Sequence, residues 1–201
     1  MAAESDEMLI AYTDGACAGN PGPGGWAWAV DGVASASGGE PVSTNQRMEV
    51  NAVREALRTL LLRTTGVVRI VSDSTYVVNC FKQRWWANWE RNGWKNSQKQ
   101  PVANQDLWKP LVEIVKTDIA RIEFVWVKGH SGNPMNDLVD RLAVSACKVI
   151  AANALLPSRF PVSTTPAGDV TDTLLPNRFP VRTTPAGDVT DAETPAQHSL
   201  F

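Results

Sequence analysis

Apolar residues follow two different periods along the first 150 residues. Short, dense apolar runs predict strands at 8–13, 24–30, 33–37, 67–72 and 121–127. Apolar residues at helical spacing predict a first helix from the capping-box pair Ser43 and Gln46 to Leu61. The same spacing predicts later helices from about residue 74 and at 84–92, 104–117 and 135–152. This element order is that of an α/β domain with a mixed sheet.

The periodic pattern stops near residue 154. Residues 155–173 and 174–192 are two nineteen-residue copies of one segment that differ at three positions. Each copy is rich in Pro, Thr, Gly and Asp and has no helical or alternating period, so it cannot bury enough surface to offset the entropy of ordering. We therefore expect a folded domain at 1–153 and a disordered tail at 154–201. The repeated Arg-Phe-Pro elements of the tail are a candidate docking motif for a protein partner.

The composition is that of an ordinary globular protein, with 43% hydrophobic and 20% charged residues. No apolar run approaches the length of a membrane span, and the acidic start MAAESDE lacks the features of a signal peptide. Cys17, Cys80 and Cys147 are odd in number and widely spaced, which disfavours a disulfide framework or a thiolate zinc site. The sequence therefore predicts a cytoplasmic protein that does not contact membranes.

Charge is balanced over the chain as a whole but not along it. The formal net charge is −2, and residues 1–150 carry sixteen basic and sixteen acidic residues. Residues 82–109 nevertheless hold six basic residues against two acidic ones, together with five of the eight tryptophans. A basic, aromatic-rich segment is typical of a surface that grips phosphates. The alternative is a tryptophan-rich helical hairpin whose lysines are merely solvated.

Two aspartates directly follow predicted strands. Asp14 comes after the first strand and Asp73 after the fourth. If these strands are parallel neighbours, both carboxylates emerge at one edge of the sheet, where ligand sites of open α/β sheets lie. Turn chemistry explains each of them as well, because Asp14-Gly15 is also a common hairpin turn.

Two further acids lie on predicted helices. Glu49 is in line with Val53 and the apolar positions after it, so it points along a buried face, which is a poor place for an isolated carboxylate. Asp140 likewise faces the body of the domain. Asp137 instead shares a face with Arg141, and we expect these two to form a solvated ion pair.

Asp14, Glu49, Asp73 and Asp140 could not all stay ionised close together without a compensating charge. Ligands that are all oxygen suit Mg²⁺ or Mn²⁺ better than zinc. Carboxylates that hold two such ions about 4 Å apart form a site for phosphodiester hydrolysis. His130, in the Gly-rich loop just before the last helix, lies close enough in the sequence to join this site.

Five segments of the sequence together resemble bacterial ribonuclease H type 1. They are YTDGACAGNPGPGGWAW, TNQRMEVNAVREAL, SDSTYVVN, WWANWERNGWK…DLWKPL and WVKGHSGNPMNDLVDRLA, and the resemblance runs from residue 8 to about 150 in unbroken order. It implies a ribonuclease H-like fold, with a five-stranded mixed sheet flanked by helices. It also implies a monomeric endonuclease that hydrolyses the RNA strand of RNA–DNA hybrids, leaves 5′-phosphate and 3′-hydroxyl ends, and removes RNA primers and R-loops.

The resemblance also implies roles for single residues. Asp14, Glu49, Asp73 and Asp140 would bind two Mg²⁺ ions, with Mn²⁺ as a substitute, and His130 would assist proton movement or product release. Residues 82–109 would be the family's basic protrusion, which grips the DNA strand. Contacts with the hybrid would come from Cys17, Asn20, Asn45, Gln46, Trp85, Trp89, Arg91, Lys95, Lys99 and Asn136. The chain departs from the family pattern at Gln46, where an asparagine is common, and at Thr75, where relatives often carry a longer amide.

Two other functions share some of these features. A module that binds hybrids without cutting them needs the basic segment but not a complete set of acids, and all four acids are present. A transposase or integrase core would have the same fold but would lack the Trp-rich segment and the KGHSGNP loop. The sequence thus favours the nuclease.

Overall fold

The computed structural model of the protein describes residues 6–154. The predicted tail at 154–201, with its duplicated segment and candidate docking motif, lies outside the described residues except for its first residue. Within residues 6–154, no helix is both long and apolar enough to cross a membrane. The elements follow in the order β1 (Leu9–Cys17), β2 (Gly22–Val30), β3 (Ala34–Ser43), α1 (Asn45–Leu60), β4 (Val68–Ser72), α2 (Thr75–Lys82), α3 (Trp85–Arg91), α4 (Gln105–Thr117), the 3₁₀ helix η1 (Ile119–Arg121), β5 (Ile122–Trp126) and α5 (Pro134–Ala154).

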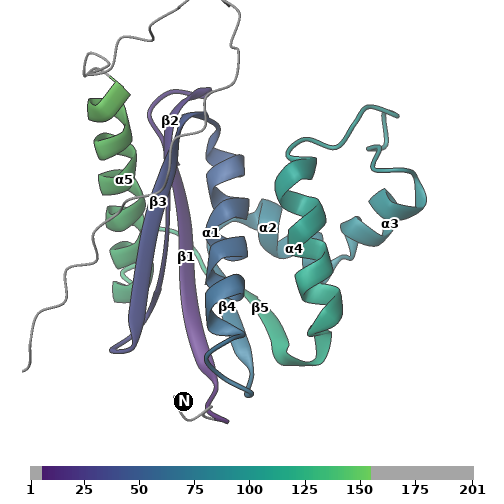
Figure 1. The fold of residues 1–201 in the computed structure, drawn as a ribbon, viewed down its shortest axis with the longest axis horizontal. Coiled ribbons are helices and arrows are strands. Elements are labelled where there is room, and N and C mark those ends of the chain that lie inside the picture. Colours follow the sequence, from purple (N-terminus) through teal and green to yellow (C-terminus); the bar gives the residue numbers. More distant parts are fainter. Residues whose placement is uncertain (1–5, 155–201) are drawn as a thin grey trace, which may run out of the picture. The chain divides into compact units, whose positions relative to one another are not determined.

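The strands form one mixed sheet in the order β3-β2-β1-β4-β5. β1, β2 and β3 are antiparallel neighbours, whereas β1, β4 and β5 run parallel to one another. The parallel half needs crossover helices, which α1 supplies between β3 and β4. The predicted α/β fold with a five-stranded mixed sheet is confirmed (Figure 1).

The register of β1 corrects the prediction that this strand ends at residue 13. Its parallel ladder with β4 ends at the pair Thr13–Ser72, but its antiparallel ladder with β2 continues to the pair Cys17–Gly24. Asp14 therefore lies inside a strand, opposite Ala27, and not in a hairpin turn. Asp14 and Asp73 are the residues that follow the last parallel pair, so the two acids occupy equivalent positions on neighbouring strands.

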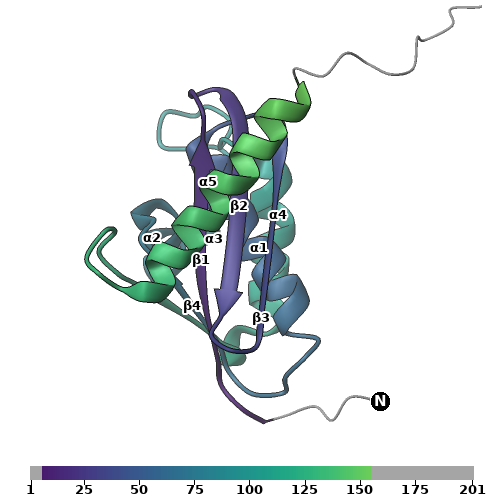
Figure 2. The same cartoon turned by 90° about the vertical axis from the view of Figure 1, so that its left-hand side faces the viewer.

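Helices cover both faces of the sheet, with α1 and α4 on one side and α5 on the other (Figures 1 and 2). The larger core lies on the α1 side and includes Leu57, Ile70 and Trp108, all fully buried. A smaller core on the α5 side gathers Ala27 and Ala29 against Val139 and Ala143. The small alanines of β2 let α5 approach the sheet closely.

Two glycines bring the flanking helices onto the sheet. A Cβ atom at Gly15 would lie 2.3 Å from the backbone nitrogen of Glu49, and one at Gly25 would lie 2.2 Å from the carbonyl oxygen of Ala143. Both distances are far below van der Waals contact with backbone that cannot move aside, so any side chain there would push a helix away. Gly15 thereby lets the N-terminal part of α1, including the backbone of Glu49, pack closely against β1 next to Asp14.

The start of α1 differs by one residue from the predicted capping box. Thr44 is the N-cap, and its hydroxyl accepts a hydrogen bond from the backbone nitrogen of Arg47. Ser43 ends β3, is 3% exposed, and donates its hydroxyl hydrogen to Glu40. Strand pairing extends the third strand from the predicted residue 37 to Ser43 and so occupies the residue that the sequence pattern assigned to the cap.

Residues 82–109, called the protrusion below, comprise the end of α2, α3, a loop and the start of α4. α3 and the loop project beyond α4, away from the sheet (Figure 1). The tryptophans anchor this segment to the body. Trp108 is fully buried, its indole N–H donates to the Tyr76 hydroxyl at 2.9 Å, and its ring meets that of Trp89 edge-on at a centroid distance of 5.4 Å.

Candidate active site

The four acids singled out in the sequence come from four elements and line one open cavity of about 440 Å³. Asp14 lies on β1, Glu49 on α1, Asp73 just after β4 and Asp140 on α5. We call this space the acidic cavity. Its lining consists of Asp14, Gly15, Ala16, Cys17, Asn45, Glu49, Asp73, His130 and Asp140.

Asp14 is the acid of this cavity whose pKa is shifted far enough to approach neutral pH. Burial raises the pKa of Asp14 to about 7, and the negative charge of Asp73 adds to this rise, as do those of Asp140 and Glu49. The backbone N–H of Gly15 donates to the Asp14 carboxylate at 2.7 Å and opposes the rise in pKa. Without a cation, Asp14 is therefore partly protonated at neutral pH.

Glu49 is held by two neutral donors. The Ser74 hydroxyl donates to Oε2 at 2.6 Å, and the Asn45 side-chain amide donates to Oε1 at 3.0 Å. Burial raises the pKa of Glu49, the hydrogen bond from Ser74 opposes that rise, and the charge of Asp73 adds to it. Both oxygens of Glu49 are thus fixed in direction before any ligand arrives.

Asp73 is positioned from three sides. The Asn136 amide donates to its Oδ2 at 3.2 Å, and the Trp126 indole N–H donates to its backbone carbonyl at 3.0 Å. A Cβ atom at Gly129 would lie 2.6 Å from Oδ2, so the loop after β5 passes close to the carboxylate. Asn136 is 2% exposed and its Oδ1 has no hydrogen-bond partner among the described residues.

The donor set of the acidic cavity fits hard divalent cations. Within residues 6–154, no three His, Cys, Asp or Glu side chains close around one point as a ready-made metal cage. Mg²⁺ does not require such a cage, because it commonly binds through one or two carboxylates, several waters and substrate phosphates. Four carboxylates with oxygen-only chemistry, one of them driven toward protonation, suit two such ions better than zinc.

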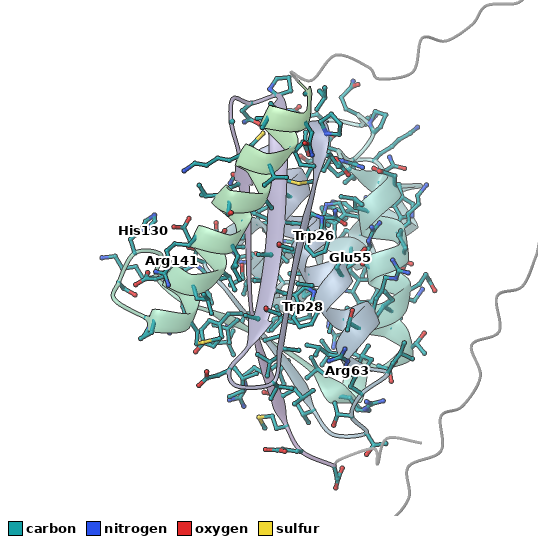
Figure 3. The ribbon with its side chains drawn as sticks, turned by 60° about the vertical axis from the view of Figure 1, so that its left-hand side comes forward. Trp26, Trp28, Glu55, Arg63, His130 and Arg141 are labelled. Atoms are coloured by element: carbon teal, nitrogen blue, oxygen red, sulfur yellow. The ribbon has the colours of Figure 1, made fainter. Side chains whose placement is uncertain are left out.

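His130 lies on the loop between β5 and α5 and lines the acidic cavity from an exposed position. Its backbone adopts a left-handed conformation, with a φ of 50°. Figure 3 shows it at the same end of α5 as Arg141. The imidazole therefore lies at the rim of the acidic cavity, where it is open to solvent.

The residues predicted to touch the hybrid near the acids fall into three environments. Cys17 and Asn45 line the acidic cavity, whereas Asn20 and Gln46 are exposed outside its lining. The Cys17 Sγ lies 3.4 Å from the backbone carbonyl oxygens of Gly22 and Ser43, which share its one hydrogen, and burial raises the pKa of the thiol and so favours its neutral form. Asn136 is buried, and its amide holds Asp73.

The predicted contacts in the protrusion divide into anchors and free cations. Trp85 and Trp89 are half-buried and pack against the larger core. Arg91, Lys95 and Lys99 are exposed, and none of them forms an ion pair within the described part of the chain. Their charges are therefore available to phosphates.

The sequence reasoning missed several residues that shape the site and misplaced one ion pair. Ser74, Trp126, Gly15 and Gly129 received no role, although the serine that follows Asp73 is a common helix N-cap and could have drawn attention. The predicted ion pair between Asp137 and Arg141 is absent from the described structure; Asp137 is half-buried and does not line the acidic cavity. Asp137 sits in the first turn of α5, where a carboxylate interacts favourably with the helix dipole without any partner.

Comparisons with known proteins agree with the geometry. The family model described as RNase H matches residues 6–148. A ribonuclease H of Moorella thermoacetica is 51% identical over 138 residues, which cover 67% of this chain and 88% of that relative.

Solved structures show the same fold. LC9-RNase H1, described as a type 1 RNase H with the type 2 active-site motif, is 32% identical, with a TM-score of 0.59 over 71% of this chain and 72% of that one. LC11-RNase H1, solved in complex with an RNA/DNA hybrid, is 21% identical, with a TM-score of 0.55 over 70% of this chain and 97% of that one.

Proposed function

The chain belongs to the RNase H family of endoribonucleases, as a bacterial type 1 member, and on that premise we propose that its acidic cavity cleaves the RNA strand of RNA–DNA hybrids by two-metal-ion catalysis. The observation that carries this proposal is the meeting of four carboxylates from four elements in one open cavity. Four carboxylates in one cavity repel one another, and a module that only binds hybrids does not need such an unfavourable arrangement.

The residues of the acidic cavity divide the work. Asp14, Glu49, Asp73 and Asp140 would hold two Mg²⁺ ions, with Mn²⁺ as a substitute. Ions held there would supply two kinds of chemistry: they would lower the pKa of an attacking water and stabilise the negative charge that develops on the leaving 3′-oxygen. His130 exchanges protons at the rim, and Ser74, Asn45 and Asn136 keep the carboxylates oriented. The expected products carry 5′-phosphate and 3′-hydroxyl ends.

The protrusion would bind the phosphates of the DNA strand, and the surface around the acidic cavity would recognise the shape of the hybrid. Arg91, Lys95 and Lys99 lie on an exposed segment that can follow the phosphates of the DNA strand. RNA–DNA hybrids present 2′-hydroxyls in a wide minor groove, which proteins recognise by shape and not by base sequence. The complex of LC11-RNase H1 with a hybrid supports this class of substrate.

One experiment tests the function directly. Purified protein is incubated with end-labelled RNA–DNA hybrid, duplex DNA and duplex RNA, with Mg²⁺ or with excess EDTA, and the fragments are tested for ligation. We expect cleavage of the RNA strand of the hybrid only, dependent on Mg²⁺, with ligatable 5′-phosphates. Binding of the hybrid without cleavage in Mg²⁺ or Mn²⁺ would identify a binding module instead.

A further inference from the structure

We propose that Ser74 is a positioning residue that fixes Glu49 relative to Asp73 and thereby sets the metal affinity and turnover of the acidic cavity. This inference rests on the proposed function of that cavity. Ser74 does not line the cavity itself and would touch neither substrate nor metal. It acts through the carboxylate to which it donates.

The hydrogen bond that carries the inference is short and protected. The Ser74 hydroxyl lies 2.6 Å from Oε2 of Glu49, and Ser74 is only 6% exposed. A hydroxyl that donates to a carboxylate makes a charge-assisted hydrogen bond, which is shorter and stronger than a neutral one. Little solvent can reach it to offer Glu49 an alternative donor.

Ser74 is itself fixed by the backbone at the end of β4. Its backbone N–H donates to the Ser72 hydroxyl at 3.2 Å, and its own hydroxyl accepts from the backbone N–H of Val77 at 3.3 Å as the N-cap of α2. The hydroxyl has one hydrogen, and the Val77 bond uses it only as an acceptor, so that hydrogen is directed at Glu49. Rotation of the Ser74 side chain would break its hydrogen bonds to both Glu49 and the backbone N–H of Val77.

The consequence is a rigid link between two acids from different elements. Asp73 precedes Ser74 in the chain, so the bond to Glu49 ties the N-terminal part of α1 to the residue that follows Asp73 at the end of β4. Asp14, Asp73 and Asp140 line the same cavity as Glu49, so like charges repel the Glu49 carboxylate from the position that the Ser74 hydrogen bond gives it. A neutral donor directs Glu49 without adding a charge that would compete with a cation.

Variants of Ser74 can separate positioning from helix capping. Ser74→Ala removes both functions, whereas Ser74→Gly removes the hydroxyl but weakens the helix cap much less than alanine does, because glycine is a tolerated N-cap residue. Ser74→Thr keeps the hydroxyl. The matched control is Ser43→Ala, since Ser43 is also buried and also donates to a carboxylate, that of Glu40 outside the acidic cavity.

Three measurements decide the matter at a temperature where each variant is folded: kcat and KM on the hybrid, the half-saturating Mg²⁺ concentration for cleavage, and Mn²⁺ binding to the protein alone by electron paramagnetic resonance. We expect kcat and Mn²⁺ affinity each to fall by about 10- to 100-fold, as is usual when a residue that orients a metal ligand is lost. The Ala and Gly variants should show the same loss. KM should change by less than about twofold. The Thr variant should keep most of the wild-type kcat and Mn²⁺ affinity, and Ser43→Ala should have the wild-type values of both.

Several outcomes would overturn the proposal. Turnover and Mn²⁺ affinity within about twofold of the wild type in both hydroxyl-free variants would show that Glu49 needs no such donor. A loss in the Ala variant that the Gly variant escapes would reduce Ser74 to a helix cap, and absence of a cooperative melt in both would make it a folding residue. If the wild type cleaves no hybrid, the proposed function fails separately, and Mn²⁺ binding still tests Ser74.

Discussion

In the acidic cavity, four like charges from four distant elements face one space, whereas in the protrusion a single stretch of chain spreads its cations over an exposed surface. The cavity acids are partly buried and are directed by neutral donors such as Ser74 and Asn136. The protrusion cations are exposed and have no carboxylate partners among the described residues. The carboxylates of the acidic cavity repel one another as long as no cation is bound, whereas the cations of the protrusion are solvated and accessible to an anionic ligand.

This difference predicts which step of the proposed reaction a mutation in each region should affect. We expect loss of a cavity acid to remove catalysis and relieve repulsion, and loss of a protrusion cation to weaken substrate binding without changing the chemical step. The two regions meet at Arg47, on the first turn of α1, whose guanidinium pairs with Asp106 at the start of α4 at 2.7 Å. This ion pair joins the protrusion to α1, the helix that carries Glu49, yet we expect the effects of mutations in the two regions to be separable.

The largest expected effect is the loss of one cavity acid. Asp14→Asn or Asp73→Asn should lower kcat by about 10³-fold or more, because each removes an anionic metal ligand worth several kcal/mol to the transition state. Hybrid binding, measured by fluorescence anisotropy, should change little. Asp137→Asn is the matched control and should stay close to the wild type. Near-normal turnover of either cavity variant in ordinary Mg²⁺ would show that the acids are misassigned.

A smaller effect is expected at the rim of the cavity. His130→Ala should slow turnover by about 10²-fold without abolishing it, which is the low end of what a group that assists proton movement contributes and is less than the loss expected for a cavity acid. Single-turnover cleavage and steady-state kcat should be compared, because slow product release affects only the latter. If single-turnover cleavage disappeared entirely, His130 would rank with the carboxylates and not below them.

The protrusion should show the opposite signature. Replacing Arg91, Lys95 and Lys99 with alanine should raise KM for the hybrid and lower the log–log salt slope of binding by about 0.7 to 0.9 for each phosphate that the protein no longer neutralises. kcat at saturating hybrid should stay near normal. Steady-state cleavage measured from low to high salt checks both effects. A salt slope equal to that of the wild type would leave the protrusion as a solvated hairpin.

The smallest expected effect concerns stability. The folded-state pKa of Asp14, about 7, exceeds its ordinary value of 3.8, so the folded protein binds this proton more tightly than the unfolded chain does. The resulting stability is fully present below pH 4 and is lost as the pH rises through about 7. Asp14→Asn should flatten this dependence and raise the unfolding temperature of the metal-free protein at pH 8 by about 2–4 °C for each kcal/mol of repulsion removed.

Calorimetry in EDTA between pH 4 and 8 measures this effect. The triple protrusion variant serves as the control and should keep the wild-type dependence on pH, because its cations lie outside the acidic cavity. Parallel stability curves for Asp14→Asn and the wild type would mean that the cavity imposes no electrostatic cost on the fold.

Much of the site can be predicted because its signals are local. The apolar residues that follow Glu49 at helical spacing place it on a buried face, and the apolar run before Asp73 places that acid at the end of a strand. The extension of β1 beyond Asp14 could not be predicted, because it depends on pairing with β2 across a glycine-rich segment. The role of Ser74 is hidden for a similar reason: its cap pattern points to its own helix, while the carboxylate it holds lies 25 residues earlier.

The spread of the four acids over β1, α1, the end of β4 and α5 also has a consequence for biosynthesis. A ribosome makes the chain in that order, so Asp14 is translated early and Asp140 last among the four. Until α5 has left the exit tunnel and packed on the sheet, the cavity lacks one of its walls as well as its fourth carboxylate. We therefore expect a nascent or truncated chain that lacks α5 to leave RNA–DNA hybrids uncut, and cleavage to begin only when the domain is complete.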